Sequence, residues 1–223
     1  MCCYPKGAAS RQPCYRSSPV LSVQNLAVAR GGATVLAGLS FDVPAGEALI
    51  LRGPNGVGKT TLLRTLAGLQ GAVSGHFDCP ADEGAYASHA DAVKSALTVE
   101  ENLQFWADIY GNAVPDMVWD QFDIRDLQSR IAGTLSAGQK RRLGLARLGV
   151  IKRKVLFLDE PTVSLDGFSV RLFADYLRDQ HLAQGGIAII ATHVDLDLAA
   201  TTLELEPFMA TDHQTDTGDE AFL

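Results

Sequence analysis

The sequence has no long hydrophobic segment, although hydrophobic residues make up 47% of its 223 residues. No apolar run approaches the roughly 20 residues that a helix needs to cross a bilayer. A chain of this length with so many hydrophobic residues can bury a core, which excludes a disordered protein and predicts one compact domain. Any role at a membrane therefore requires a membrane-embedded partner.

Cysteine pairs and a net positive charge are lacking as well. The four cysteines are Cys2, Cys3, Cys14 and Cys79, they form no C-x-x-C pair, and no secretory signal is recognisable, so a reducing compartment is favoured over a disulfide framework. From Leu203 onward there are six acids and no Lys or Arg; without these acids the formal net charge of -7 would be about -1. We expect no nucleic-acid partner for such an acidic chain.

The two ends of the sequence differ from its middle. Residues 1–19 contain basic residues and no acids, but Pro5, Pro13 and Pro19 break any amphipathic helix and no apolar signal segment is present. We therefore expect a disordered leader over 1–19, a folded domain over 20–207 and an acidic, disordered tail over 208–223.

Short apolar strands alternate with helices along the folded part, which predicts an α/β fold with a mixed, largely parallel central sheet. Strands are expected at Leu21–Val28, 39–43, Ala48–Leu51, Val155–Leu158 and, as the last buried strand, Ile187–Ala191. Helices are expected at Thr60–Ala67, 98–110 and 136–151. The last two begin with capping boxes, in which the first and fourth residues bond to each other's backbone.

The strongest motif runs from Gly53 to Thr60, between a predicted strand and a predicted helix, and has the form G-x-x-x-x-G-K-T. Its glycines let backbone N–H groups surround phosphate oxygens, and the helix N-terminus adds partial positive charge. Lys59 is expected to reach the β- and γ-phosphates, and the Thr60 hydroxyl to ligate Mg²⁺. The expected cofactors are ATP and Mg²⁺, and the predicted nucleotide-binding residues here are Gly53, Pro54, Asn55, Gly56, Val57, Gly58, Lys59, Thr60 and Thr61.

A second motif is the apolar strand at Val155 that ends in Asp159 and Glu160. Two carboxylates at a strand end are by themselves usually a solvated strand end. Together with the phosphate-binding loop they predict a catalytic pair, because such a strand delivers its last residues to the phosphate site. Asp159 is expected to hold Mg²⁺, and Glu160 to orient and polarise the attacking water.

The segment Leu135-Ser-Ala-Gly-Gln139 resembles the signature motif of ABC ATPases, which carries a second glycine at the position of Ala137. The Ser136 hydroxyl and the N–H of Gly138 at a helix N-terminus can donate to an anion. In that family the signature of one subunit closes over the γ-phosphate bound by the other. The resemblance therefore implies a nucleotide contact, from the partner subunit, by Ser136, Ala137, Gly138 and Gln139.

Further motifs follow in the order of that family. Ser164-Leu165-Asp166 resembles its D-loop, and His193 resembles the catalytic switch histidine that contacts the γ-phosphate. The resemblance extends from about Leu21 to Pro207. It implies a P-loop NTPase fold in which the parallel sheet carries an antiparallel β edge and a small helical lobe at about 90–134.

Four stretches are similar to one group of ABC ATPases, the ATP-binding subunits of cytochrome c maturation (heme exporter) systems. These stretches are 85–94, 97–103, 135–148 and 158–166. His89 stands where most ABC ATPases have a metal-ligating glutamine, and this group accepts histidine there, which supports the narrower resemblance. Whether the His89 region contributes to the metal site is left open. Most members also stack an aromatic residue on the adenine; Arg30 holds that position here, either as a guanidinium stacked on the base or as a solvated turn residue.

The resemblance implies a homodimer of ATPase subunits on the cytoplasmic face of the inner membrane. Integral membrane permease subunits would contact it at His89–Phe105, and hydrolysis would energise heme delivery to c-type cytochromes. A subunit of another ABC importer or exporter would have the same catalytic residues and is the main alternative. A soluble ABC ATPase acting on ribosomes or DNA is more remote, because this acidic chain has neither a second ATPase domain nor a long coiled coil. A P-loop kinase would need an acceptor site in place of the signature-like segment and would phosphorylate a small molecule.

Overall fold

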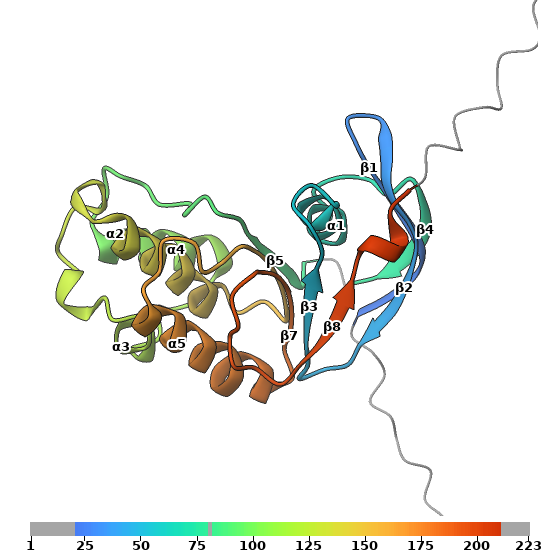
Figure 1. Ribbon diagram of the computed structural model, residues 1–223. Coiled ribbons are helices and arrows are strands. Elements are labelled where there is room, and N and C mark those ends of the chain that lie inside the picture. Colours follow the sequence, from blue (N-terminus) through green and yellow to red (C-terminus); the bar gives the residue numbers. More distant parts are fainter. Residues whose placement is uncertain (1–20, 80–81, 211–223) are drawn as a thin grey trace, which may run out of the picture.

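The computed structural model describes residues 21–79 and 82–210. Within them the chain forms two β-sheets, and most helices gather on one side of the larger sheet (Figure 1). The predicted leader, 1–19, and residues 211–223 of the predicted tail lie outside the described residues. No helix in the described part of the chain is long and apolar enough to cross a membrane.

The larger sheet has five parallel strands in the order β5-β6-β7-β3-β8. Every residue of β6 and β7 is buried, as their uninterrupted apolar sequences predict for strands covered on both faces. Parallel pairing brings the carboxyl ends of all these strands to one edge of the sheet. The strands are β3 (Ala48–Arg52), β5 (Gly84–Ala87), β6 (Val155–Asp159), β7 (Ile187–Ala191) and β8 (Ala200–Glu204).

The smaller sheet is antiparallel and has the strand order β2-β1-β4. Strand β1 (Leu21–Arg30) is joined to β2 (Ala33–Val43) by the turn at Gly31 and Gly32, and β4 (Ser74–Asp78) pairs with the other side of β1. The predicted combination of parallel and antiparallel strands is therefore confirmed, and the antiparallel strands form a sheet of their own.

The helices are α1 (Lys59–Leu66), α2 (Val99–Tyr110), α3 (Met117–Gln121), α4 (Ala137–Ile151) and α5 (Gly167–Asp175). Both predicted capping boxes are confirmed: Thr98 with Glu101 opens α2, and Ser136 with Gln139 opens α4. Helix α5 continues as a π-helix over Tyr176–His181. Short 3₁₀ turns occupy Arg125–Leu127, Ala132–Thr134, Leu182–Gln184 and Glu206–Phe208.

Two hydrophobic cores cover opposite faces of the parallel sheet. Alternate residues of β6 point to opposite sides, so Leu156 and Leu158 join a core with α2, α3, α4 and α5, while Phe157 joins a core with α1 and the antiparallel sheet. The predicted helical lobe at about 90–134 contains α2 and α3. It shares its core with α4 and α5 and is continuous with the helical layer.

Ile187–Ala191 is the last buried strand, as predicted. The sequence analysis did not predict β8, which follows it, has no buried residue and pairs in parallel with β3. The fold also extends past residue 207: the N–H of Ala210 donates to the Val35 carbonyl at 3.1 Å, and Met209 forms a β-bridge with Leu36. The predicted tail thus begins too early by at least three residues, since 208–210 are paired with β2.

Candidate active site

The loop from Gly53 to Gly58 connects β3 to α1 at the carboxyl edge of the parallel sheet. Gly53 and Gly58 have φ angles of 138° and 119°, a region that residues with a Cβ rarely adopt. A Cβ at Gly58 would also lie 3.0 Å from Leu36 Cδ1 of β2. Glycine at these positions is therefore required by the curl of the loop and by the strand that lies against it.

The first turn of α1 is prepared for an anion. Its N-cap is Gly58, which supplies no side-chain cap, and no acid stands in its first turn. The first N–H groups of a helix have no partner within the helix, so these donors and the helix dipole suit a phosphate. Lys59 Nζ donates to the carbonyls of Gly53 and Pro54, at 2.7 and 3.1 Å, which keeps its charge over the same loop. The site fits the phosphates of ATP.

Asp159 ends β6 at the same edge and is 5% exposed. The Tyr86 hydroxyl, from β5, donates to Asp159 Oδ2 at 3.1 Å. Burial, together with the negative charge and hydrogen bond of Asp159, raises the pKa of Tyr86 well above its usual value, so Tyr86 stays a neutral donor. A carboxylate and the Thr60 hydroxyl are oxygen donors of the kind that Mg²⁺ prefers.

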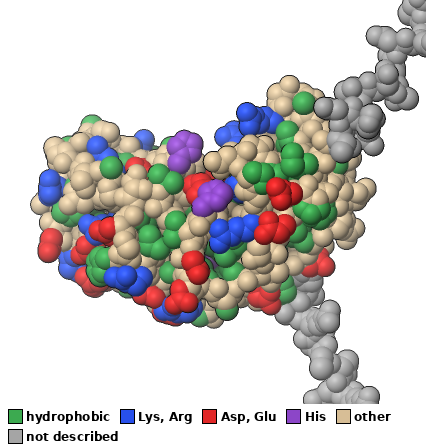
Figure 2. Space-filling model, viewed as in Figure 1, with side chains coloured by type: hydrophobic (Ala, Val, Ile, Leu, Met, Phe, Trp, Pro, Cys, Tyr) green, Lys and Arg blue, Asp and Glu red, His purple; other side chains and the backbone are tan. Residues whose placement is uncertain are grey.

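Three predicted residues from three different loops meet beside the glycine-rich loop. His193 follows β7, and its Nε2 lies 3.3 Å from Asn55 Oδ1 and 3.6 Å from Glu160 Oε1. Figure 2 shows histidine side chains next to acidic ones at the centre of this face. Glu160 itself has a left-handed backbone with φ 49°, and its N–H donates to the Ala191 carbonyl at 2.8 Å. The structure thus brings the predicted base and the predicted switch histidine together.

The segment that resembles the signature lies at the start of α4. Ser136 and Ala137 are exposed, and a Cβ at Gly138 would lie 3.3 Å from the Ser164 carbonyl, so the D-loop-like segment abuts the signature-like one. Ala137, at the position of the family's second glycine, is the first residue of the helix. Among the described residues, no hydrogen bond joins 136–139 to the loop at 53–58.

Two other predicted residues lie at the surface. Arg30 is exposed at the end of β1, in the hairpin whose Val35 and Leu36 lie against Gly58. His89 is exposed in the segment after β5, and no cluster of three His, Cys, Asp or Glu side chains suited to a metal occurs in the described part of the chain.

Sequence reasoning missed three residues that organise the site: Tyr86, Arg52 and Arg141. Arg52 Nη1 donates to the Thr192 carbonyl at 2.7 Å, next to His193. Arg141 is 3% exposed, and its guanidinium donates to the Glu160 and Pro161 carbonyls. Its position, one and two turns before Leu145 and Leu148 on an apolar helix face, was a signal for a buried arginine.

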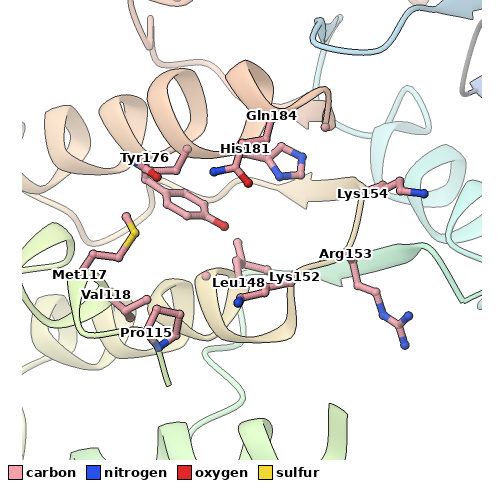
Figure 3. A pocket seen from close by; sticks show the side chains of 13 residues that line it. Pro115, Met117, Val118, Leu148, Lys152, Arg153, Lys154, Tyr176, His181 and Gln184 are labelled. Carbon is pink, nitrogen blue, oxygen red and sulfur yellow. The ribbon is translucent and has the colours of Figure 1, made fainter. Parts of the chain in front are cut away.

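A cavity of about 300 Å³ lies elsewhere, between α3, the end of α4 and the π-helix (Figure 3). It is lined by Met117, Leu148, Tyr176 and His181 among others, and also by Lys154 and Gly186, which precede β6 and β7. The cavity is therefore at the amino-terminal edge of the sheet, opposite the glycine-rich loop, and is separate from the site.

Comparisons with known proteins agree with this geometry. A family model described as ABC transporter matches residues 36–163. The chain is 59% identical over 194 residues to the cytochrome c biogenesis ATP-binding export protein CcmA of Paracoccus denitrificans, covering 86% of this chain and 92% of that protein. It is 56% identical over 204 residues to the protein of the same name from Cereibacter sphaeroides, covering 91% and 97%.

Solved structures share the fold. An ATP-binding protein from Pyrococcus furiosus superposes with a TM-score of 0.74 at 23% identity, covering 85% of this chain and 99% of that chain. CbiO1 of Clostridium perfringens, part of an ABC transporter complex, gives a TM-score of 0.66 at 26% identity and covers 79% of both chains. The chain therefore belongs to the ATP-hydrolysing subunits of ABC transporters, in the group of cytochrome c biogenesis ATP-binding export proteins.

Proposed function

We propose that this chain hydrolyses ATP to energise heme export, or delivery, for c-type cytochrome biogenesis. The observation that carries the catalytic part is the convergence of Asn55, Glu160 and His193 beside the glycine-rich loop. The identity to the CcmA proteins over most of the chain supports the biological part. A subunit of another ABC importer or exporter remains the second candidate, because its site would use the same residues.

The positions of the residues support one proposed role for each. Lys59 and the first amides of α1 bind the phosphates, since both face the curl of the loop. Thr60 and Asp159 hold Mg²⁺, which neutralises charge on the phosphates when bound. Glu160 orients and polarises the attacking water, and His193 contacts the γ-phosphate.

The signature residues act on the nucleotide of a second subunit. Within one chain the capping box of α4 uses the N–H groups of Ser136 and Gln139. The hydroxyl hydrogen of Ser136 and the N–H of Gly138 lie outside this box and are donors for an anion. Ser136 is exposed and Gly138 is partly buried, and neither donor bonds to the chain's own glycine-rich loop within the described residues. A homodimer that pairs each loop with the partner's signature would therefore complete the site.

A membrane permease contacts the dimer over His89–Phe105, on the cytoplasmic face of the inner membrane. Asn102 gives this region a fixed shape: it is 2% exposed, its Oδ1 accepts from the Lys94 N–H at 2.8 Å, and its Nδ2 donates to the Thr98 carbonyl at 2.8 Å. Lys94 Nζ lies 4.2 Å from the centre of the Phe105 ring. A segment held in one shape by these contacts can transmit a movement between the permease and the ATPase subunit.

The test is replacement in a bacterium that lacks its own cytochrome c biogenesis export ATPase. This chain should restore covalent heme in c-type cytochromes, measured by heme staining of denatured proteins, and the Glu160→Gln chain should not. If the chain is produced, joins the membrane fraction and hydrolyses ATP without restoring cytochromes, it serves another ABC system and the heme proposal is wrong.

A further inference from the structure

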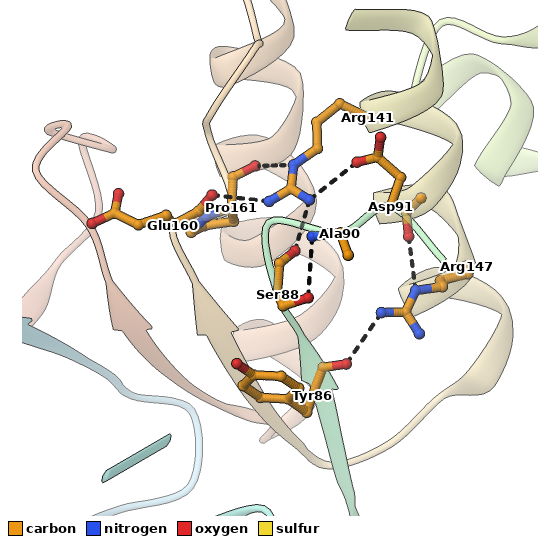
Figure 4. Close-up of polar contacts among 9 residues, drawn as sticks. Tyr86, Ser88, Ala90, Asp91, Arg141, Arg147, Glu160 and Pro161 are labelled. Atoms are coloured by element: carbon orange, nitrogen blue, oxygen red, sulfur yellow. Dashed lines mark hydrogen bonds and ion pairs between the residues drawn. The ribbon is translucent and has the colours of Figure 1, made fainter. Parts of the chain in front are cut away.

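Arg141 connects three segments that are far apart in the sequence (Figure 4). From the second turn of α4, its Nε donates to the Pro161 carbonyl at 2.8 Å and its Nη2 to the Glu160 carbonyl at 2.9 Å. Its Nη1 donates to the Ser88 carbonyl at 2.7 Å and to Asp91 Oδ1 at 3.2 Å. The guanidinium is 3% exposed, so a buried cation is held almost entirely by these four acceptors.

A neighbouring glycine keeps the segment Ser88–Asp91 against the same helix. Gly144 lies one turn after Arg141, and a Cβ on it would come within 2.5 Å of the Asp91 carbonyl oxygen, which is backbone. Only a glycine lets the segment pack this closely. Two features of α4, one hydrogen-bonding and one steric, therefore fix Ser88–Asp91 independently of each other.

On its other side, Arg141 donates to the carbonyl of Glu160, whose backbone conformation is unusual. Glu160 has φ 49°, which a residue with a side chain adopts only when its surroundings impose it. Its N–H is held by Ala191 and its carbonyl by Arg141. This conformation directs the carboxylate toward His193, 3.6 Å away. Without the hydrogen bonds from Arg141, the carbonyls of Glu160 and Pro161 would no longer be tied to α4.

We propose that Arg141 is a positioning residue for ATP hydrolysis: it holds Glu160 in its left-handed conformation and ties it to Ser88–Asp91. The proposal rests on the proposed role of Glu160 as the residue that orients water. Ser88–Asp91 overlaps the start of the proposed permease contact at His89–Phe105, so a displacement of this segment would reach Glu160 through the Arg141 guanidinium. Lysine cannot replace Arg141, because one ammonium cannot bond in a planar fork to acceptors on both sides.

Arg147 provides a matched control. It lies on the same helix and is 8% exposed. Its Nη2 donates to the Tyr86 carbonyl at 3.1 Å and its Nε to the Gly144 carbonyl at 3.0 Å, but it makes no hydrogen bond to Glu160 or Pro161 in the described structure. An Arg→Lys change therefore disturbs a buried guanidinium of α4 at either position, and only at Arg141 does it release Glu160.

The experiment measures steady-state ATP hydrolysis and ATP binding of the full chain in the membrane complex with which it co-purifies. Arg141→Lys should lower kcat by about 100-fold, the cost of a misplaced catalytic group, and change KM for ATP by less than about threefold. Arg147→Lys should leave kcat within about threefold of wild type. All variants are assayed well below their melting temperatures, measured by circular dichroism.

Gly144→Ala is the second variant, because it keeps Arg141 and favours the helix while its Cβ pushes Ser88–Asp91 away. It should lower kcat by about 10-fold with KM unchanged. If Arg141→Lys does not fold, Gly144→Ala decides the proposal. Wild-type kcat in a folded Arg141→Lys, or in Gly144→Ala when only that variant folds, would overturn it, as would an equal loss of kcat in Arg147→Lys.

A double mutant separates this proposal from the role of Glu160. If Arg141 acts through Glu160, then adding Arg141→Lys to Glu160→Gln should change the residual rate by less than about twofold. Losses that multiply would show that Arg141 acts by another route and would refute the inference alone. If Glu160→Gln by itself hydrolyses ATP at the wild-type rate, the proposed function of Glu160 is wrong.

Discussion

Helices α1 and α4 both begin at a loop that is proposed to face phosphate, yet their first turns differ. The N-cap of α1, Gly58, provides no side-chain hydrogen bond, whereas Ser136 caps α4 with a complete capping box. Lys59 is buried in its own loop, while Ser136 is exposed. The first amides of α1 therefore depend on a ligand for their partners, whereas the capping box of α4 already satisfies the N–H of Gln139 within the chain.

This difference shows how one chain can carry two incomplete halves of a site. The α1 half is proposed to bind the nucleotide, since its charge and its amide donors converge on one loop. The α4 half has a capping box and still offers the hydroxyl hydrogen of Ser136 and the N–H of Gly138. Such a surface adds to binding only when another subunit presents a phosphate to it.

The largest expected effect is the loss of ATP hydrolysis when Glu160, which lies beside the glycine-rich loop, is replaced. Glu160→Gln keeps the shape of the side chain and removes the proton acceptor, so kcat should fall by about 100- to 1,000-fold while ATP binding is retained. The measurement is phosphate release together with a nucleotide titration. Glu204→Gln is the control, because Glu204 also ends a strand of the parallel sheet but is exposed at β8. A Glu160→Gln chain that turns over normally would contradict the assignment.

A smaller effect is expected at the adenine. No aromatic residue stands between Leu21 and Ser40, and Arg30 lies in the hairpin that covers Gly58. A guanidinium stacked on the base would contribute ~0.5–2 kcal/mol, so Arg30→Ala should weaken ATP binding by up to about 30-fold.

Two further variants test whether a flat side chain is what position 30 needs. Arg30→Tyr should restore much of the affinity, and Arg30→Lys less, because a compact ammonium does not stack as a plane. Titration at constant salt measures all three. If the alanine variant binds ATP as tightly as arginine does, Arg30 is a turn residue.

The smallest effect compares two capping boxes. Ser136→Ala and Thr98→Ala each remove the cap of one helix, which costs about 1 kcal/mol of folding stability in either case. Only Ser136 is proposed to face a nucleotide, so hydrolysis should fall in Ser136→Ala and stay near wild type in Thr98→Ala. Thermal melting and phosphate release measure the two quantities. Equal hydrolysis in both variants would leave Ser136 with a structural role only.

Much of the site could be predicted because its residues are defined by local sequence. The glycine-rich loop needs positive φ at fixed positions, the capping boxes need fixed residue types three apart, and β6 and β7 are uninterrupted apolar runs. Each of these signals lies within one segment of the chain.

The missed features depend on contacts between distant segments. Strand β8 is a largely exposed edge strand without an apolar run, and Met209 and Ala210 pair with β2, which lies far away in the sequence. Arg141 and Tyr86 gain their roles from carbonyls and a carboxylate on β6 and the segments beside it. A single sequence names these residues but does not show which backbone groups surround them.

The glycine-rich loop of one subunit and the start of α4 of the other are proposed to complete one site across a dimer. Co-expression of Lys59→Ala and Ser136→Arg chains with two different tags yields a heterodimer with one intact composite site and one doubly damaged site. Its ATP hydrolysis should reach up to about half the wild-type rate, far above either mutant homodimer. A heterodimer no more active than the two mutant homodimers, or full activity in a clearly monomeric wild-type chain, would contradict the account.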